Sequence, residues 1–240
     1  MHIAWTTSST AGDTDADLPL LRAASERAGV DADVVAWDDP AVDWIAYDAV
    51  VVRSCWDYTA RPVEFLAWAA SVAHLFNPID VLRWNTDKTY LRDLAAAGVP
   101  VIDTLWDVAD VAELGDRPEW VVKPTVSAGS RDTARWTEPA DAVAHSVQLQ
   151  AAGRSSMTQP YVASVDEEGE TALLFIGGTF SHAIRKGPLL LPGEGVRQDR
   201  DSREDITARQ ATDDQRAVAE VALAAVPFAD DLLYARVDLV

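Results

Sequence analysis

The sequence is poor in cysteine, in long apolar runs and in positive charge. Its one cysteine, Cys55, permits no intrachain disulfide and no thiolate zinc site. The longest apolar stretch, residues 217–229, is interrupted by Glu220 and is too short to cross about 30 Å of hydrocarbon, so no membrane partner is expected. The first residues lack the cationic start and apolar core of a signal peptide, which predicts a cytoplasmic protein.

Lysine is the scarcest charged residue. The 20 basic residues face 39 acidic ones, and the net charge of −19 disfavours nucleic acid as a partner. Only three of the basic residues are lysines, Lys88, Lys123 and Lys186. Each follows or ends a predicted strand or precedes a predicted helix. Because the other basic residues are arginines, these three positions are interpreted as sites that need the compact charge of an ammonium group rather than a planar guanidinium group.

What the sequence does contain is a folded-protein composition, with 240 residues of which 48% are hydrophobic. Strand and helix patterns alternate over residues 1–84, which predicts a parallel sheet with helical crossovers. We expect strands at 3–7, 33–37 and 49–53 and helices at 17–28 and from Pro62. The first strand is followed by Trp5–Thr10 instead of the G-x-G-x-x-G fingerprint, so a Rossmann oxidoreductase is a disfavoured alternative.

From residue 85 onward the pattern becomes α+β. A helix is expected from Tyr90, ended by Gly98, and an extended strand at 99–101. The other expected elements are strands at 120–124, 157–162, 171–176, 180–186 and 232–240, a hairpin turn at Gly177–Gly178, a long functional loop at 187–205 and a capping box at Thr212–Gln215.

Five short motifs occur in a fixed order along the chain. The first is Asn85–Lys88, which precedes a helix, and the second is Gly98–Pro100, which follows that helix. The others are Val121–Pro124, which is followed by a Ser/Gly loop, then Gln159–Val162, and finally Tyr234–Asp238. This order resembles the ATP-grasp ligases. Arg53–Tyr58 and Ser181–Lys186 narrow the resemblance to the glutathione-synthetase-like branch, and within it to the O-ureido-serine cyclo-ligases of cycloserine biosynthesis.

The resemblance implies an α/β fold in three parts. Residues 1–84 would form a parallel-sheet pre-ATP-grasp domain on the substrate side, 85–162 a linker helix with the small ATP-grasp lobe, and 163–240 the large lobe. Family members carry a further strand with a Glu and an Asn or Glu after the Arg-Val-Asp strand. We therefore expect the last lobe to be truncated and the 240-residue chain to turn over feebly.

The resemblance also implies ATP and Mg²⁺ as cofactors. Lys88 and Lys123 would hold the phosphates under the loop that contains Ser127, Gly129 and Ser130. Tyr161 and Val162 would bind adenine through their backbone, with Gln159 nearby. Glu170, or Asp166 as the alternative, would bind the ribose. Lys186 and Arg236 would stabilise the transferred phosphoryl group as catalytic residues, and Asp238 would ligate magnesium. Phosphoryl transfer needs such convergence because it depends mainly on positioning and charge neutralisation.

The substrate residues implied are Arg53, Trp56, Asp57, Tyr58, His182 and Arg185. Arg53 and Asp57 would suit the carboxylate and ammonium of an amino acid, although Asp57 also fits a turn cap and His182 an ordinary strand histidine. Cys55 fits a packed thiol.

The expected activity is ATP-dependent activation of the carboxylate of a small amino-acid-like substrate. An amine-type nucleophile would then form a C–N bond, ring closure within one molecule included. The alternative is a non-catalytic nucleotide-binding protein without a complete magnesium site. Assembly into a homo-oligomer is left open.

Overall fold

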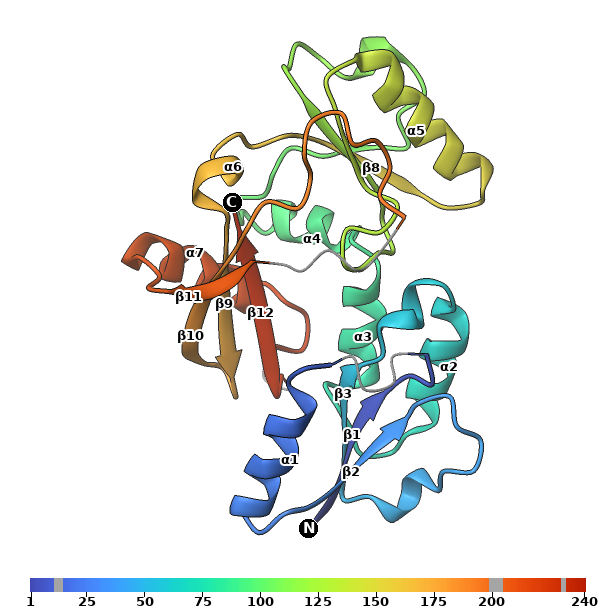
Figure 1. The fold of residues 1–240 in the computed structure, drawn as a ribbon, viewed down its shortest axis with the longest axis vertical. Helices are drawn as coiled ribbons and strands as arrows, with labels where there is room; N and C mark the ends of the chain where they lie inside the picture. Colours follow the sequence, from blue (N-terminus) through green and yellow to red (C-terminus); the bar gives the residue numbers. More distant parts are fainter. Residues whose placement is uncertain (11–14, 199–204, 230–231) are drawn as a thin grey trace. The chain divides into compact units, whose positions relative to one another are not determined.

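The computed structural model describes residues 1–10, 15–198, 205–229 and 232–240 (Figure 1). These residues form two compact units. The first consists of Met1–Thr86 and a short segment ending at Leu233, and the second of Asp87–Ala229 and Tyr234–Val240. Within the described ranges no helix is long and apolar enough to span a membrane.

The first unit is built on a four-stranded sheet in the order β2-β1-β3-β4, in which every pair is parallel. The strands are β1 (His2–Thr7), β2 (Asp31–Ala36), β3 (Ala49–Ser54) and β4 (Leu75–Phe76), and the helices are α1 (Leu18–Arg27), α2 (Pro62–Ser71) and α3 (Ile79–Thr86). The parallel sheet confirms the prediction. The short strand β4 and helix α3 were not predicted.

Helices cover both faces of this sheet (Figure 1). On one face Ala4 and Val50, neighbours on β1 and β3, pack against Ala69 of α2 in a buried cluster. On the other face the indole of Trp5 donates to Ser25 of α1 over 3.3 Å. Covering on both sides explains why β3 begins with an unbroken apolar run.

The second unit contains two antiparallel four-stranded sheets. One has the order β5-β8-β6-β7, with β5 (Leu105–Trp106), β6 (Trp120–Pro124), β7 (Ala134–Trp136) and β8 (Ser156–Pro160). The other has the order β11-β10-β9-β12, with β9 (Glu170–Ile176), β10 (Thr179–Lys186), β11 (Ile206–Arg209) and β12 (Tyr234–Leu239). The helices are α4 (Tyr90–Ala96), α5 (Pro139–Ala151), α6 (Val165–Glu168) and α7 (Asp213–Ala224).

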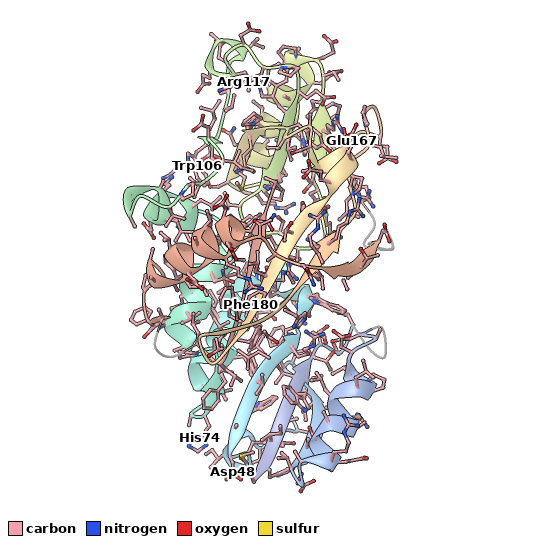
Figure 2. All side chains as sticks on the ribbon, turned by 90° about the vertical axis from the view of Figure 1, so that its left-hand side faces the viewer. Asp48, His74, Trp106, Arg117, Glu167 and Phe180 are labelled. Carbon is pink, nitrogen blue, oxygen red and sulfur yellow. The ribbon has the colours of Figure 1, made fainter. Side chains whose placement is uncertain are left out.

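Each sheet of the second unit has its own core. Ala142 and Leu149 of α5 pack with Trp120 and Val122 of β6. Leu173 and Phe175 of β9 pack with Ala183 and with Ala219 of α7. Figure 2 labels Phe180 at the hairpin end of the second sheet and Glu167 at the opposite end, where β9 begins and β10 ends.

Several local predictions can be compared directly with the structure. The hairpin at Gly177–Gly178 is confirmed, with φ of 53° and 73°, and so is the capping box at Thr212 and Gln215. The strand expected at 99–101 is wrong, because residues 99–104 lie outside helices and strands and the strand begins at Leu105. Pro100 offers no N–H to a ladder.

The long loop predicted at 187–205 is partly described. Residues 187–198 contain neither helix nor strand, and residues 199–204 of the prediction lie outside the described residues.

Candidate active site

Lys88 is bound to the loop that follows β6. Its backbone N–H donates to the Thr125 carbonyl over 3.0 Å. Its ammonium donates to the Ser127 carbonyl over 2.6 Å and to the Ser127 hydroxyl over 2.9 Å. The turn between α3 and α4 therefore fixes the Lys88 Nζ beside the Ser/Gly loop, as the sequence motifs imply.

Lys88 and Lys123 act on each other as like charges, and neither makes an ion pair within the described ranges. Burial, and to a lesser degree the charge of Lys123, lower the pKa of Lys88 to about 7 against the opposing effect of Asp87. Burial also lowers the pKa of Lys123. The charge of Lys186 adds to this decrease, and the charge of Glu170 opposes it. Within the described ranges Lys123 Nζ has no hydrogen-bond or ion-pair partner. Two cationic groups thus lie where the protein itself supplies little negative charge.

Lys186 lies between two carboxylates at the ends of the second sheet. Its Nζ is 3.0 Å from Glu170 Oε2 and 3.7 Å from Asp238 Oδ2. Burial opposes its charge, but Asp238 and Glu170 outweigh burial and raise the pKa of Lys186. Arg236 holds Asp238 with a two-pronged contact, Nε to Oδ1 over 2.8 Å and Nη2 to Oδ2 over 2.9 Å. The four residues come from β9, β10 and β12.

This cluster is not a ready-made metal site. Among the described residues no three His, Cys, Asp or Glu side chains gather in a way that would hold a metal ion. Asp238 supplies a carboxylate of the type that Mg²⁺ prefers, and Mg²⁺ commonly uses one or two carboxylates with substrate phosphates.

The Ser/Gly loop has backbone conformations suited to a tight anion cradle. Gly129, Ser130 and Asp132 have φ of 62°, 56° and 54°. Ser127 is buried, and its hydroxyl donates to the Pro124 carbonyl over 3.1 Å. Successive N–H groups in such turns form concavities that bind anions.

The loop is tied to the segment that follows β10. The Asp132 N–H donates to the Arg197 carbonyl over 2.8 Å, and the Arg197 N–H donates to the Thr133 carbonyl over 3.0 Å. The Arg197 side chain donates in turn to the Leu189 carbonyl. The predicted functional loop therefore pairs with the predicted phosphate loop.

The exit of β8 carries the residues expected to bind adenine. The Tyr161 N–H is already used, because it donates to the Glu119 carbonyl over 3.0 Å. The Val162 N–H makes no hydrogen bond to another described residue. Buried Gln159 donates to the Thr104 hydroxyl over 2.8 Å. Asp166, the alternative ribose ligand, accepts a hydrogen bond from the Tyr161 hydroxyl, whereas Glu170 pairs with Lys186.

In the first unit Arg53 is paired within the chain. Its Nε lies 3.1 Å from the buried Asp15, and its Nη2 also contacts Asp17. Asp15 additionally accepts a hydrogen bond from Ser54. These contacts join the end of β3 to the segment before α1, so a substrate carboxylate at Arg53 would compete with two aspartates.

Asp57 belongs to a network at the carboxyl ends of the parallel strands. It accepts from the Trp37 indole over 2.9 Å and from Arg61. Arg61 also donates to Asp38 over 2.7 Å, and Asp38 accepts the Ser9 N–H over 3.0 Å. Figure 2 labels Asp48 and His74 at the amino ends of β3 and β4, the opposite edge of the sheet.

Asp38 and Arg61 were not identified from sequence. Asp38 follows the parallel strand β2 and therefore lies at the edge where open sheets bind ligands. The groove there, of about 410 Å³, is lined by Trp37, Asp38, Asp39, Pro40, Val42, Trp44, Arg61, Glu64 and Trp68.

The remaining substrate candidates have differing surroundings. Trp56 and Tyr58 lie in a 3₁₀ turn after β3, and burial raises the pKa of Tyr58, which packs on Phe65. His182 contacts the Ser181 hydroxyl over 3.0 Å. Arg185 donates to backbone carbonyls of α6, including Glu168 over 2.8 Å.

Comparison with known proteins identifies the family. The N-terminal domain family of D-cycloserine synthetase DcsG matches residues 3–77. The cycloserine biosynthesis protein DcsG of Streptomyces lavendulae is 44% identical over 229 residues, which cover 88% of this chain and 75% of that protein. The chain belongs to the D-cycloserine synthetase family. The crystal structure of D-cycloserine synthetase DcsG superposes on all of this chain and 86% of its own with a TM-score of 0.89 and 39% identity.

The D-cycloserine synthetase family has the ATP-grasp fold. D-alanine–D-alanine ligase from Bacillus anthracis superposes over 100% of this chain and 83% of its own with a TM-score of 0.67 at 14% identity. The chain is thus an ATP-grasp ligase of the kind that forms C–N bonds, with the α/β fold expected from sequence. The roles given to single residues remain predictions.

Proposed function

We propose that this D-cycloserine synthetase family member binds ATP with Lys88, Lys123 and Lys186 around the phosphates. The observation that supports this most is geometric: Lys88 Nζ is bound to Ser127 of the Ser/Gly loop, Lys123 lies just before that loop, and neither lysine makes an ion pair within the described ranges. A polyphosphate supplies the missing negative charge, and the loop's N–H groups supply hydrogen bonds. Glu170 would bind the ribose, and the Tyr161–Val162 backbone the adenine.

The chain's net charge of −19 does not oppose this binding. Charges beyond a Debye length of about 8 Å are screened, whereas an ammonium at about 4 Å from a phosphate oxygen gains about 4 kcal/mol at an effective dielectric constant of about 20. Magnesium fits the same place, because Asp238 supplies an oxygen ligand and the phosphates would supply others. Bound there, the ion would neutralise phosphate charge.

We propose a carboxylate-activating reaction on a small amino-acid-like substrate. The substrate carboxylate would take the γ-phosphoryl group to form an acyl phosphate, with Lys186 and Arg236 stabilising the charge. An amine nitrogen would then displace phosphate. The name D-cycloserine synthetase of the relative favours ring closure within one molecule. Arg53, Asp57 and their neighbours would contact the substrate, and we propose a cytoplasmic location.

Calorimetry with a nonhydrolysable ATP analogue tests the nucleotide part. We expect binding that Mg²⁺ strengthens and that Lys123→Met weakens by about tenfold or more, since a charge-assisted contact is lost. NAD should not bind. Binding indifferent to Mg²⁺, with no ADP release from ATP and O-ureidoserine, would support the non-catalytic alternative. Failure of the analogue to bind would refute the proposal.

A further inference from the structure

A buried arginine that the proposed reaction does not use connects four segments of the second unit. Arg135 of β7 is 6% exposed. Its Nε and Nη2 donate to Glu119 Oε2 over 3.0 and 2.5 Å, and its Nη1 donates to Asp166 Oδ1 over 2.8 Å. The Nη1 also approaches the Leu190 carbonyl at 3.4 Å. The guanidinium carbon lies 3.5 Å from the ring centre of Tyr161.

The partners of Arg135 are also linked to one another. The Tyr161 hydroxyl donates to Asp166 Oδ1 over 2.5 Å, and the Tyr161 N–H donates to the Glu119 carbonyl over 3.0 Å. Arg135, and to a lesser degree Tyr161, hold the pKa of Asp166 below its usual range. The side chain and the backbone of Tyr161 are therefore both fixed, and the guanidinium lies at the centre of the contacts that fix them.

This network determines where the next N–H group lies. Val162 follows Tyr161 directly, and its N–H makes no hydrogen bond to another described residue. A donor held on a rigid segment binds a planar acceptor with less loss of conformational freedom than a donor on a loose one.

We propose that Arg135 is a positioning residue that holds the Tyr161–Val162 segment in place to bind a purine base. The inference rests on the proposed function, because it takes ATP as the ligand. Arg135 itself does not contact the nucleotide. The phosphate contacts would come from Lys88 and Lys123, which make no hydrogen bond with Arg135 in the described part of the chain.

The proposal predicts a selective defect, which a merely structural role would not produce. We expect Arg135→Met to weaken binding of a nonhydrolysable ATP analogue by about tenfold or more while inorganic triphosphate binds within about twofold of wild type. Preference for the adenine over the guanine nucleotide should fall as well. Arg135→Lys keeps the charge without the fork and should restore only part of the ATP affinity.

Arg92→Met is the matched control. Arg92 also stacks on an aromatic ring, with its guanidinium carbon 4.4 Å from the ring centre of Trp106, but it does not contact Tyr161. Affinity for both probes should be unchanged in this variant. If Arg135→Met does not fold, Glu119→Gln replaces it, because Glu119 accepts two contacts from Arg135 and has no proposed contact with the nucleotide. We expect the same selective loss, about threefold or more.

Two results would overturn the inference. One is a folded Arg135→Met, or Glu119→Gln in its place, with unchanged ATP affinity and base preference. The other is an equal loss of ATP and triphosphate binding, which would indicate a general structural role. Failure of the wild-type chain to bind the ATP analogue would instead refute the proposed function, so the two failures are distinguishable.

Discussion

The low pKa of Lys88 predicts that nucleotide binding takes up a proton. Burial and the charge of Lys123 lower the pKa of Lys88 to about 7, so much of the free protein carries a neutral amine at this position near pH 8. A bound phosphate favours the ammonium form and raises the pKa. Binding should then be coupled to protonation of Lys88.

The size of the coupling follows from the two pKa values. With a pKa of about 7, roughly one tenth of Lys88 is protonated at pH 8, and a bound-state pKa near the ordinary value of about 10.4 makes protonation complete. The expected uptake is about 0.9 proton per nucleotide at pH 8 and about 0.1 at pH 6. This is the share of Lys88; Lys123, whose pKa burial also lowers, should add to the uptake, whereas Lys186 should contribute little because its pKa is raised.

Calorimetry in buffers of differing ionisation enthalpy measures this uptake with a nonhydrolysable ATP analogue. The dependence of the heat on the buffer should be steep at pH 8 and nearly flat at pH 6. Lys88→Arg is the control, because arginine stays protonated in both states and should remove the share of the uptake that belongs to Lys88. Tight binding at pH 8 without proton uptake by the wild type would refute the reasoning.

The same shift has a consequence for stability. The folded pKa of Lys88 lies below the unfolded value, so between about pH 7 and 10 the unfolded chain binds more protons at this residue. Stability contributed by Lys88 therefore rises with pH over that window and is smallest below pH 7. Lys88→Met should flatten this part of a pH series of urea unfolding curves.

Three further predictions concern folding and reactivity. Gly169→Ala should cost about 2 kcal/mol or more in urea unfolding, because φ is +70° and the added Cβ would lie 2.4 Å from the Lys186 carbonyl oxygen; Gly29→Ala, at φ +67° in open space, should cost only about 1 kcal/mol. Thr212→Ala should cost about 1 kcal/mol by removing the cap of α7, and Thr212→Ser should cost much less; equal losses would contradict the capping role. Burial raises the pKa of Cys55 to about 12, so a thiol reagent should modify it only when the protein unfolds, and rapid native labelling would contradict this.

The parts of the fold that could be predicted carry strong local signals. The apolar run of β3 indicated a strand covered on both faces, and Gly177–Gly178 indicated the hairpin because both residues adopt positive φ. Helix α5 was missed although it spans Pro139–Ala151, since its small and polar residues give little apolar periodicity. Strand β4 has two residues, too few for any pattern.

The candidate site divides in a similar way. The three lysines stood out because lysine is rare in this chain and each lies within one of the motifs. The partners of Arg53 could not be inferred, because Asp15 and Asp17 lie more than thirty residues earlier and only the fold brings them to the end of β3. The same is true of Arg135 and its ion pairs. Long-range charge pairing depends on tertiary structure, which local sequence patterns do not report.

The pairing of charges explains how an acidic protein can offer an anion site. Arginines such as Arg61, Arg135 and Arg236 direct their forks at carboxylates of the chain, so their charge is balanced within the fold. Lys88 and Lys123 make no ion pair in the described part of the chain. Salt screens exposed charges that lie farther away than a Debye length. The excess of acidic residues elsewhere on the chain therefore does not cancel the local electrostatic potential at these two lysines. An anionic ligand would complete their environment, which is the role that we propose for these two lysines.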